Sequence, residues 1–155
     1  MALLANTITD THFARRDRMG RTLVFLARIL AAGKTREARA IAAGERTVAL
    51  VEASGAISIV GRGAVYFLRA SRPATVCRPG IPFTVGEIAA YRLRAGGAFD
   101  LKAWSGAGGE PYTLTVDNGV VRSSQSGCAS RKPRMRQNLR RRRRVAARGH
   151  AASRL

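Results

Sequence analysis

From Arg46 onward the chain alternates apolar and polar residues, and turn signals recur about every 8 to 12 residues. Successive side chains of a β-strand point to opposite faces of a sheet, so this pattern predicts an all-β unit. We expect strands at residues 47–53, 56–60, 64–69, 74–77, 81–85, 88–94, 99–104 and 112–116.

The links at residues 95–97, 105–111 and 117–119 contain the glycines that tight reversals need. Residues 88–94 alternate between an apolar set and a set that contains Arg92 and Arg94, so one face is expected in the core and the other in water. An antiparallel meander is the simplest topology for such strands. We therefore predict a mainly β fold, either a small antiparallel β-sandwich or a partly open barrel.

Before this unit, residues 11–32 have the pattern of a helix, with Asp10 or Thr11 as its N-cap and Gly33 after its last turn. Its second half, residues 23–30, is apolar nearly all round, and we expect it to be buried or to form an assembly interface. The residues that repeat there at helical spacing are Leu23, Leu26, Ala27 and Leu30.

Four arginines lie in the first half of this helix, near the positive end of its dipole, where cations are unfavourable: Arg15, Arg16, Arg18 and Arg21. The helix start is therefore expected either to fray or to be held by an anionic partner. A second, short helix is predicted at residues 36–43, capped by Thr35 and ended by Gly44.

Charge is the compositional outlier. The 155 residues carry 28 Lys and Arg against 9 Asp and Glu, a formal net charge of +19. The last acidic residue is Asp117, and twelve basic residues follow from position 122 onward. Like charges at this density repel one another, so we expect a flexible tail that stays unfolded until a partner neutralises it. The chain divides into a helical segment (1–44), an antiparallel β domain (45–122) and a basic tail (123–155).

The composition of the tail predicts contact with nucleic acid, because a guanidinium group can donate two parallel hydrogen bonds to one phosphate group. The candidate binding residues are Arg131, Lys132, Arg134, Arg136, Arg140, Arg141, Arg142, Arg143, Arg144 and Arg148. No aromatic residue lies among them to stack on bases, so binding without sequence specificity is expected. A trafficking signal, a contact with a membrane surface and an unselected extension are the alternatives.

The β domain offers a secondary surface. Alternation places Trp104 on the wet face of the meander beside Arg92, Arg94 and Lys102, where its ring could stack on a base. The alternative is that Trp104 packs under a neighbouring loop or against the N-terminal helices.

Residues for catalysis or metal binding are sparse. His12 and His150 lie near opposite ends of the chain, and Cys77 and Cys128 have no paired-ligand spacing. The string from Gly33 to Thr35 lacks the earlier glycine of a phosphate-binding loop, since Arg28 occupies that position. We expect two free thiols, no catalytic residue, no metal and no cofactor.

The strongest apolar stretch, residues 22–32, is far shorter than the roughly 20 residues that span a bilayer. The N-terminus has no basic region before a long apolar run, so it does not look like a secretory signal. A soluble protein is expected, intracellular or within a virion.

The leading hypothesis is a non-catalytic structural protein, such as a virus or phage virion component, that forms a homo-oligomer or larger assembly through the helix at residues 23–30 and contacts nucleic acid with its tail. One alternative is a ribosomal or ribosome-associated protein that binds rRNA. The other is a small ligand-binding β domain with an incidental basic tail.

Overall fold

The computed structural model describes residues 3–125. This part of the chain contains ten strands and one helix. In chain order they are β1 (Thr7–Asp10), α1 (Met19–Ala31), β2 (Ala38–Ala43), β3 (Thr47–Val51), β4 (Ala56–Gly61), β5 (Ala64–Ala70), β6 (Val85–Arg94), β7 (Ala98–Asp100), β8 (Ser105–Ala107), β9 (Glu110–Asp117) and β10 (Val120–Ser123).

The strands form two sheets. A large sheet has the order β1-β2-β5-β6-β9-β10, and a small sheet has the order β3-β4-β7-β8. Strand β1 runs parallel to β2, and every other pair in the two sheets is antiparallel. The mainly β prediction is confirmed, and within residues 3–125 neither sheet closes into a barrel.

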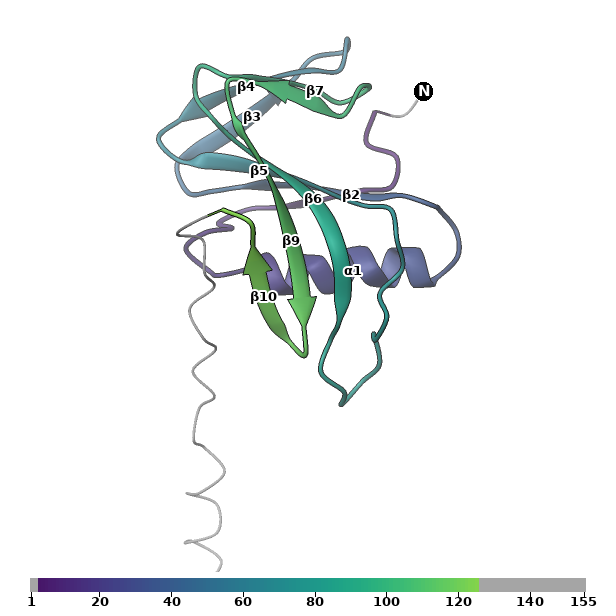
Figure 1. Cartoon of the computed structure of the whole chain (residues 1–155). Coiled ribbons are helices and arrows are strands. Elements are labelled where there is room, and N and C mark those ends of the chain that lie inside the picture. Colours follow the sequence, from purple (N-terminus) through teal and green to yellow (C-terminus); the bar gives the residue numbers. More distant parts are fainter. Residues whose placement is uncertain (1–2, 126–155) are drawn as a thin grey trace, which may run out of the picture.

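The elements stack in three layers, with the large sheet in the middle (Figure 1). Helix α1 covers one face of this sheet through Leu23, Leu26 and Leu30, which pack on side chains of β2, β5, β6 and β9. The small sheet covers the opposite face, where Ile57, Ile59 and Phe99 meet residues of β2, β5 and β6. Strands β2 and β5 are therefore buried on both faces. In β6 the expectation of one core face and one wet face is wrong for another reason, because each face holds both kinds of residue: buried Ala90 and exposed Arg94 on one, exposed Ala89 and buried Leu93 on the other.

The predicted meander is also wrong. The strand predicted at residues 88–94 is part of β6. It pairs with β9 rather than with β7, because β7 and β8 belong to the small sheet. The chain thus leaves the large sheet after β6, adds two short strands to the small sheet and returns as β9.

The second predicted helix does not form. Its residues make β2, a central strand that pairs with β1 on one side and β5 on the other. Thr35 does not cap a helix but bonds with its hydroxyl to the backbone of Glu37, and the N–H of Gly44 donates to the carbonyl of Ala64.

The first helix is shorter than predicted. It begins at Met19 with Arg18 as its N-cap, which makes no side-chain capping bond, and residues 11–17 form an irregular connection instead. Its end matches the prediction, because Gly33 has φ 69° and its N–H donates to the carbonyl of Leu30. The described helix is too short and not apolar enough to cross a membrane.

Other differences concern the existence or the length of individual strands. Residues 74–77 and 81–84 form no strand and share one isolated bridge, between Val76 and Thr84. The predicted strand at 99–104 ends at Asp100, and a turn follows it. Strands β1, β8 and β10 were not expected, and each lies at the edge of its sheet.

Candidate nucleic-acid interface

The ten arginine and lysine residues proposed to bind nucleic acid, from Arg131 to Arg148, lie outside the described residues, as do Cys128 and His150. The charge of residues 3–125 shows whether the folded part is basic as well. Residues 3–125 hold seventeen Lys and Arg and nine Asp and Glu, a formal net charge of +8. The folded part is therefore cationic on its own.

Trp104 does not lie on a wet face. Its side chain is 9% exposed and packs edge to face against Phe67 and Phe99, with ring centroids 6.2 and 5.3 Å away. The guanidinium of Arg39 lies over the ring, 4.6 Å from its centroid. Stacking on a base would require the core between the two sheets to open, so the predicted role for Trp104 is wrong. The alternative, packing under a loop or against the N-terminal helices, does not describe these contacts either, because Phe67, Phe99 and Arg39 belong to β5, β7 and β2.

A turn explains why alternation misplaced Trp104. The Asp100 carboxylate accepts hydrogen bonds from the backbone N–H groups of Lys102 and Ala103, at 2.7 and 2.9 Å. These bonds lower the pKa of Asp100 from its ordinary value. The strand ends there, and Trp104 adopts φ 51°, which turns its indole back into the core.

The four residues of the predicted secondary surface are not brought together. Arg92 and Arg94 share the alternation of Ile88 and Ala90, whose side chains belong to the cluster under α1. Trp104 belongs to the cluster on the opposite face of the large sheet. Lys102 is exposed in the turn between β7 and β8. Only Arg92 and Arg94 remain as neighbours.

Arg92 and Arg94 lie beside the start of the tail. The guanidinium of Arg92 donates to the Glu110 carboxylate at 2.6 Å, and the side-chain amide of Gln125 donates to the same carboxylate at 2.8 Å. The hydrogen bond from Arg92 is the main reason why the pKa of Glu110 lies below its ordinary value, and the charge of Arg94 contributes to the shift. Gln125, the last described residue of the tail, is thus anchored beside Arg92, which sequence reasoning did not find because Glu110 and Gln125 are fifteen positions apart.

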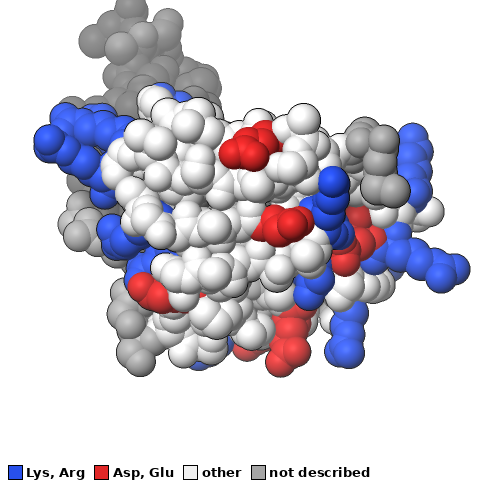
Figure 2. Space-filling model, turned by 90° about the horizontal axis from the view of Figure 1, so that it is seen from above, with Lys and Arg blue, Asp and Glu red and all other residues white. Residues whose placement is uncertain are grey.

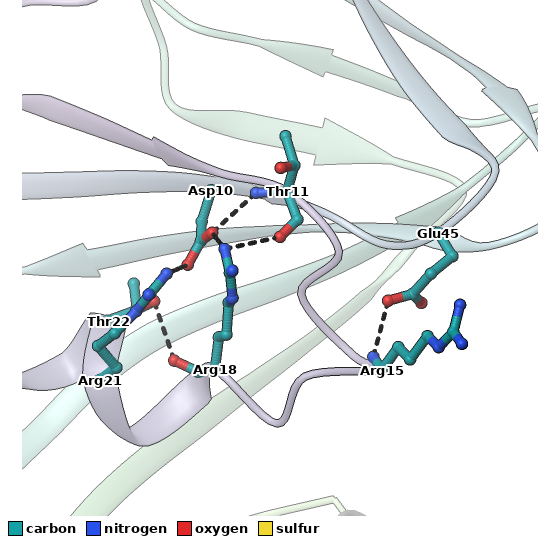
Figure 3. A network of polar contacts seen from close by, with 7 residues as sticks. All are labelled: Asp10, Thr11, Arg15, Arg18, Arg21, Thr22 and Glu45. Atoms are coloured by element: carbon teal, nitrogen blue, oxygen red, sulfur yellow. Dashed lines mark hydrogen bonds and ion pairs between the residues drawn. The ribbon is translucent and has the colours of Figure 1, made fainter.

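The arginines at the start of α1 have an internal anionic partner (Figure 3). Asp10, at the end of β1, is ion-paired with Arg18 and with Arg21, the latter at 2.6 Å. Burial raises the pKa of Asp10, but the hydrogen bonds from Arg21 and Arg18 outweigh this effect and hold the pKa below its ordinary value. The backbone N–H of Arg15 donates to Glu45 at 2.9 Å. These contacts fix the connection between β1 and α1, so we assign them a structural role.

Among residues 3–125, no three His, Cys, Asp or Glu side chains come close enough together to hold a metal ion. His12 lies in the connection before α1, and Cys77 is partly buried in the loop between β5 and β6. No protein-family model and no curated protein sequence matches the chain.

Proposed function

We propose that the protein is a non-catalytic structural protein whose Arg-rich tail contacts nucleic acid without sequence specificity. The observation that carries this proposal is the charge distribution: no acidic residue follows Asp117, and eleven basic residues follow Ser123. A segment with this charge lowers its own repulsion by binding the phosphate backbone, which releases condensed counterions.

The folded part supports this proposal in two ways. Its net charge has the same sign as that of the tail, so a polyanion held by the tail is not repelled by the body. The tail also begins next to Arg92, through the Glu110 carboxylate that Arg92 and Gln125 share, and Arg94 acts on the same carboxylate; these two arginines could extend the contact with phosphates onto the folded surface. The proposed interface does not include Trp104, which is buried, or Lys102, which lies in the turn between β7 and β8.

The test is the salt dependence of binding to a duplex oligonucleotide. If about eight tail residues contact phosphates, the logarithm of the binding constant falls with the logarithm of the salt concentration at a slope of roughly −7. Replacing Arg140, Arg141, Arg142, Arg143 and Arg144 by Gln in the full chain removes up to five contacts. The expected slope is then roughly −3.

Replacing the same five arginines by Lys is the matched control, because it keeps the charge and removes only the guanidinium forks. This variant should keep a slope close to that of the unaltered chain. The proposal is wrong if the Gln variant binds duplex as tightly, and with the same slope, as the unaltered chain. Equal affinity for unrelated duplex sequences is expected, and a strong preference for one sequence would contradict the unspecific binding mode.

A role in a virion is the narrower form of this proposal, and binding to rRNA is its alternative. Both use the same polycation and differ in the assembly that contains it. Light scattering after size-exclusion chromatography separates them, since a virion component should form particles with nucleic acid. Co-sedimentation of a monomer with ribosomal subunits at moderate salt would instead favour the rRNA-binding alternative.

A further inference from the structure

Strand β3 forms one edge of the small sheet, and β4 is its only strand partner among residues 3–125. The N–H of Glu52 donates to Ala56, and the carbonyl of Arg46 accepts from Arg62, so even-numbered positions along β3 point their backbone groups toward β4. The odd-numbered positions, Thr47, Ala49 and Val51, therefore direct their N–H and C=O groups away from β4. These groups can pair with another strand.

This edge lacks the features that usually prevent pairing between chains. Natural edge strands are protected by charges, prolines, bulges or very short length. The five residues of β3 include no charge and no proline, and their register with β4 is regular. Among the described strands at sheet edges, β3 is the longest, since β1 and β10 have four residues and β8 has three.

The outer face next to this edge is apolar. Val48, Leu50 and Val60 are 53%, 50% and 54% exposed, and Val48 lies directly opposite Val60 in the sheet. Figure 2 views the molecule from the side of the small sheet and shows a mostly white surface with a few Asp and Glu groups on it, while Lys and Arg project mainly from its two sides. Two bodies that each carry a net charge of +8 can approach most closely through such a face.

The sequence across β3 is complementary to itself when it is read in the antiparallel direction. It runs Arg46, Thr47, Val48, Ala49, Leu50, Val51, Glu52. With Ala49 opposite Ala49 of a second copy, Thr47 faces Val51, and these are the positions whose backbone groups point outward. Val48 then lies opposite Leu50 on the exposed face. Arg46 and Glu52 adjoin the two ends of β3, Arg46 in the preceding turn with φ 52°, so this register brings Arg46 of each copy near Glu52 of the other and two pairs of opposite charge flank the apolar segment.

We infer that β3 is a homodimer interface, in which the β3 strands of two copies pair antiparallel about Ala49 and join two small sheets into one continuous sheet. The interface is isologous, as a two-fold axis requires, because each copy contributes the same strand. Backbone hydrogen bonds provide the affinity, and the Arg46 and Glu52 pairs select the register. The inference does not depend on nucleic-acid binding, since it uses residues of the folded part alone.

The experiment measures the mass of the full chain by sedimentation equilibrium over a range of concentrations, without nucleic acid and at one fixed salt concentration. A mass that rises from 16.7 kDa to twice that value is expected. Glu52→Arg places like charges opposite each other at both ends of the interface, and it should weaken dimerisation about tenfold. The double variant Arg46→Glu/Glu52→Arg restores opposite charges and should return the dissociation constant to that of the unaltered chain.

Glu87→Arg is the matched control, because it changes an exposed carboxylate on β6 by the same charge, away from β3. It should leave dimerisation unchanged, and circular dichroism should show all variants folded. A chain that stays at 16.7 kDa throughout the range overturns the inference. So does a dimer that responds equally to Glu52→Arg and Glu87→Arg, or one that the double variant fails to restore.

Discussion

The guanidinium of Arg39 covers the ring of Trp104 at 4.6 Å, and this contact joins the middle strand β2 to the turn that follows β7. Arg39 is held in place by Glu37, to which it is ion-paired at 2.5 Å, and by the carbonyl of Leu101 at 3.3 Å. A cation over an indole face is stabilising by about 0.5–2 kcal/mol, depending on its exposure to water. The indole is therefore enclosed by a cation on one side and by aromatic rings on others.

Because Trp104 is the only tryptophan, intrinsic fluorescence reports on this site alone. We expect the emission of a buried indole and weak quenching by acrylamide. Adding a single-stranded oligonucleotide should leave both unchanged, since the ring has no free face. An emission maximum typical of an exposed indole, or strong quenching by the oligonucleotide, would contradict the enclosed position of Trp104.

Trp104→Ala should lower the free energy of unfolding by about 3–5 kcal/mol, because it leaves a cavity between Phe67, Phe99 and Arg39. Trp104→Phe keeps an aromatic ring and should cost clearly less. Urea denaturation followed by circular dichroism measures both values. Equal, small losses for the two variants would show that the ring is not part of the core.

Asp10 makes the free energy of unfolding depend on pH in the acidic range. Its pKa is lower in the folded protein than the ordinary value of 3.8, so the carboxylate contributes stability that is fully present above pH 3.8 and is lost as the pH falls through the folded-state pKa. Asp10→Asn should lower the free energy of unfolding at neutral pH by about 1–3 kcal/mol, because Arg18 and Arg21 lose an ionised acceptor.

The matched control for this variant is Asp117→Asn, which removes an exposed carboxylate at the end of β9. Unfolding by urea at neutral pH and near pH 3 measures both variants against the unaltered chain. The difference between Asp10→Asn and the unaltered chain should shrink at the lower pH. A difference that is the same at both pH values would show that the ionised form of Asp10 is not what holds the helix start.

The sequence predicted the β3, β4, β5 and β9 strands well, because each is rich in β-branched or aromatic residues and adjoins a glycine-containing turn. It failed at β2, where the run of alanines favours a helix by propensity. In the structure Ala38, Ala40 and Ala42 are buried on one face and Ile41 on the other. A strand buried on both faces shows no alternation in its sequence, so its tertiary contacts decide its conformation.

The candidate interface was only partly accessible to sequence reasoning for a similar reason. Alternation placed Arg92 and Arg94 together correctly because they lie two residues apart on one regular strand. It could not place Trp104, since the turn set by Asp100 breaks the period before position 104. The ion pair of Arg92 with Glu110 depends on β6 pairing with β9, which the expected meander did not include.

Two glycines with positive φ should respond very differently to alanine. At Gly61, with φ 122°, an added Cβ would lie 2.1 Å from the carbonyl oxygen of Arg46, so Gly61→Ala should cost about 3–5 kcal/mol of stability. At Gly80, with φ 77°, no atom lies within 4 Å of the added carbon, and only the backbone conformation opposes the change. Gly80→Ala should therefore cost about 1–2 kcal/mol. Thermal unfolding of both variants checks this order.

The apolar face of helix α1 belongs to the core of its own chain, so we expect it not to form an interface between chains. Leu26 is fully buried against the large sheet, whereas Phe25 is 44% exposed on the other side of the helix. Leu26→Ala should lower the free energy of unfolding by about 2–5 kcal/mol, and Phe25→Ala by clearly less. Neither change should alter the dissociation constant of a β3-mediated dimer, provided that the variant remains folded.

The measurement combines urea unfolding with sedimentation equilibrium on the same samples. If Leu26 and its neighbours formed an assembly interface, Leu26→Ala would change the mass measured by sedimentation equilibrium and would lower the free energy of unfolding only slightly. The buried position predicts the reverse, because the residues at 23–30 that repeat at helical spacing already pack against side chains of their own chain. Association of this protein should then depend on Arg46 and Glu52 at the ends of β3 and be insensitive to the apolar face of α1.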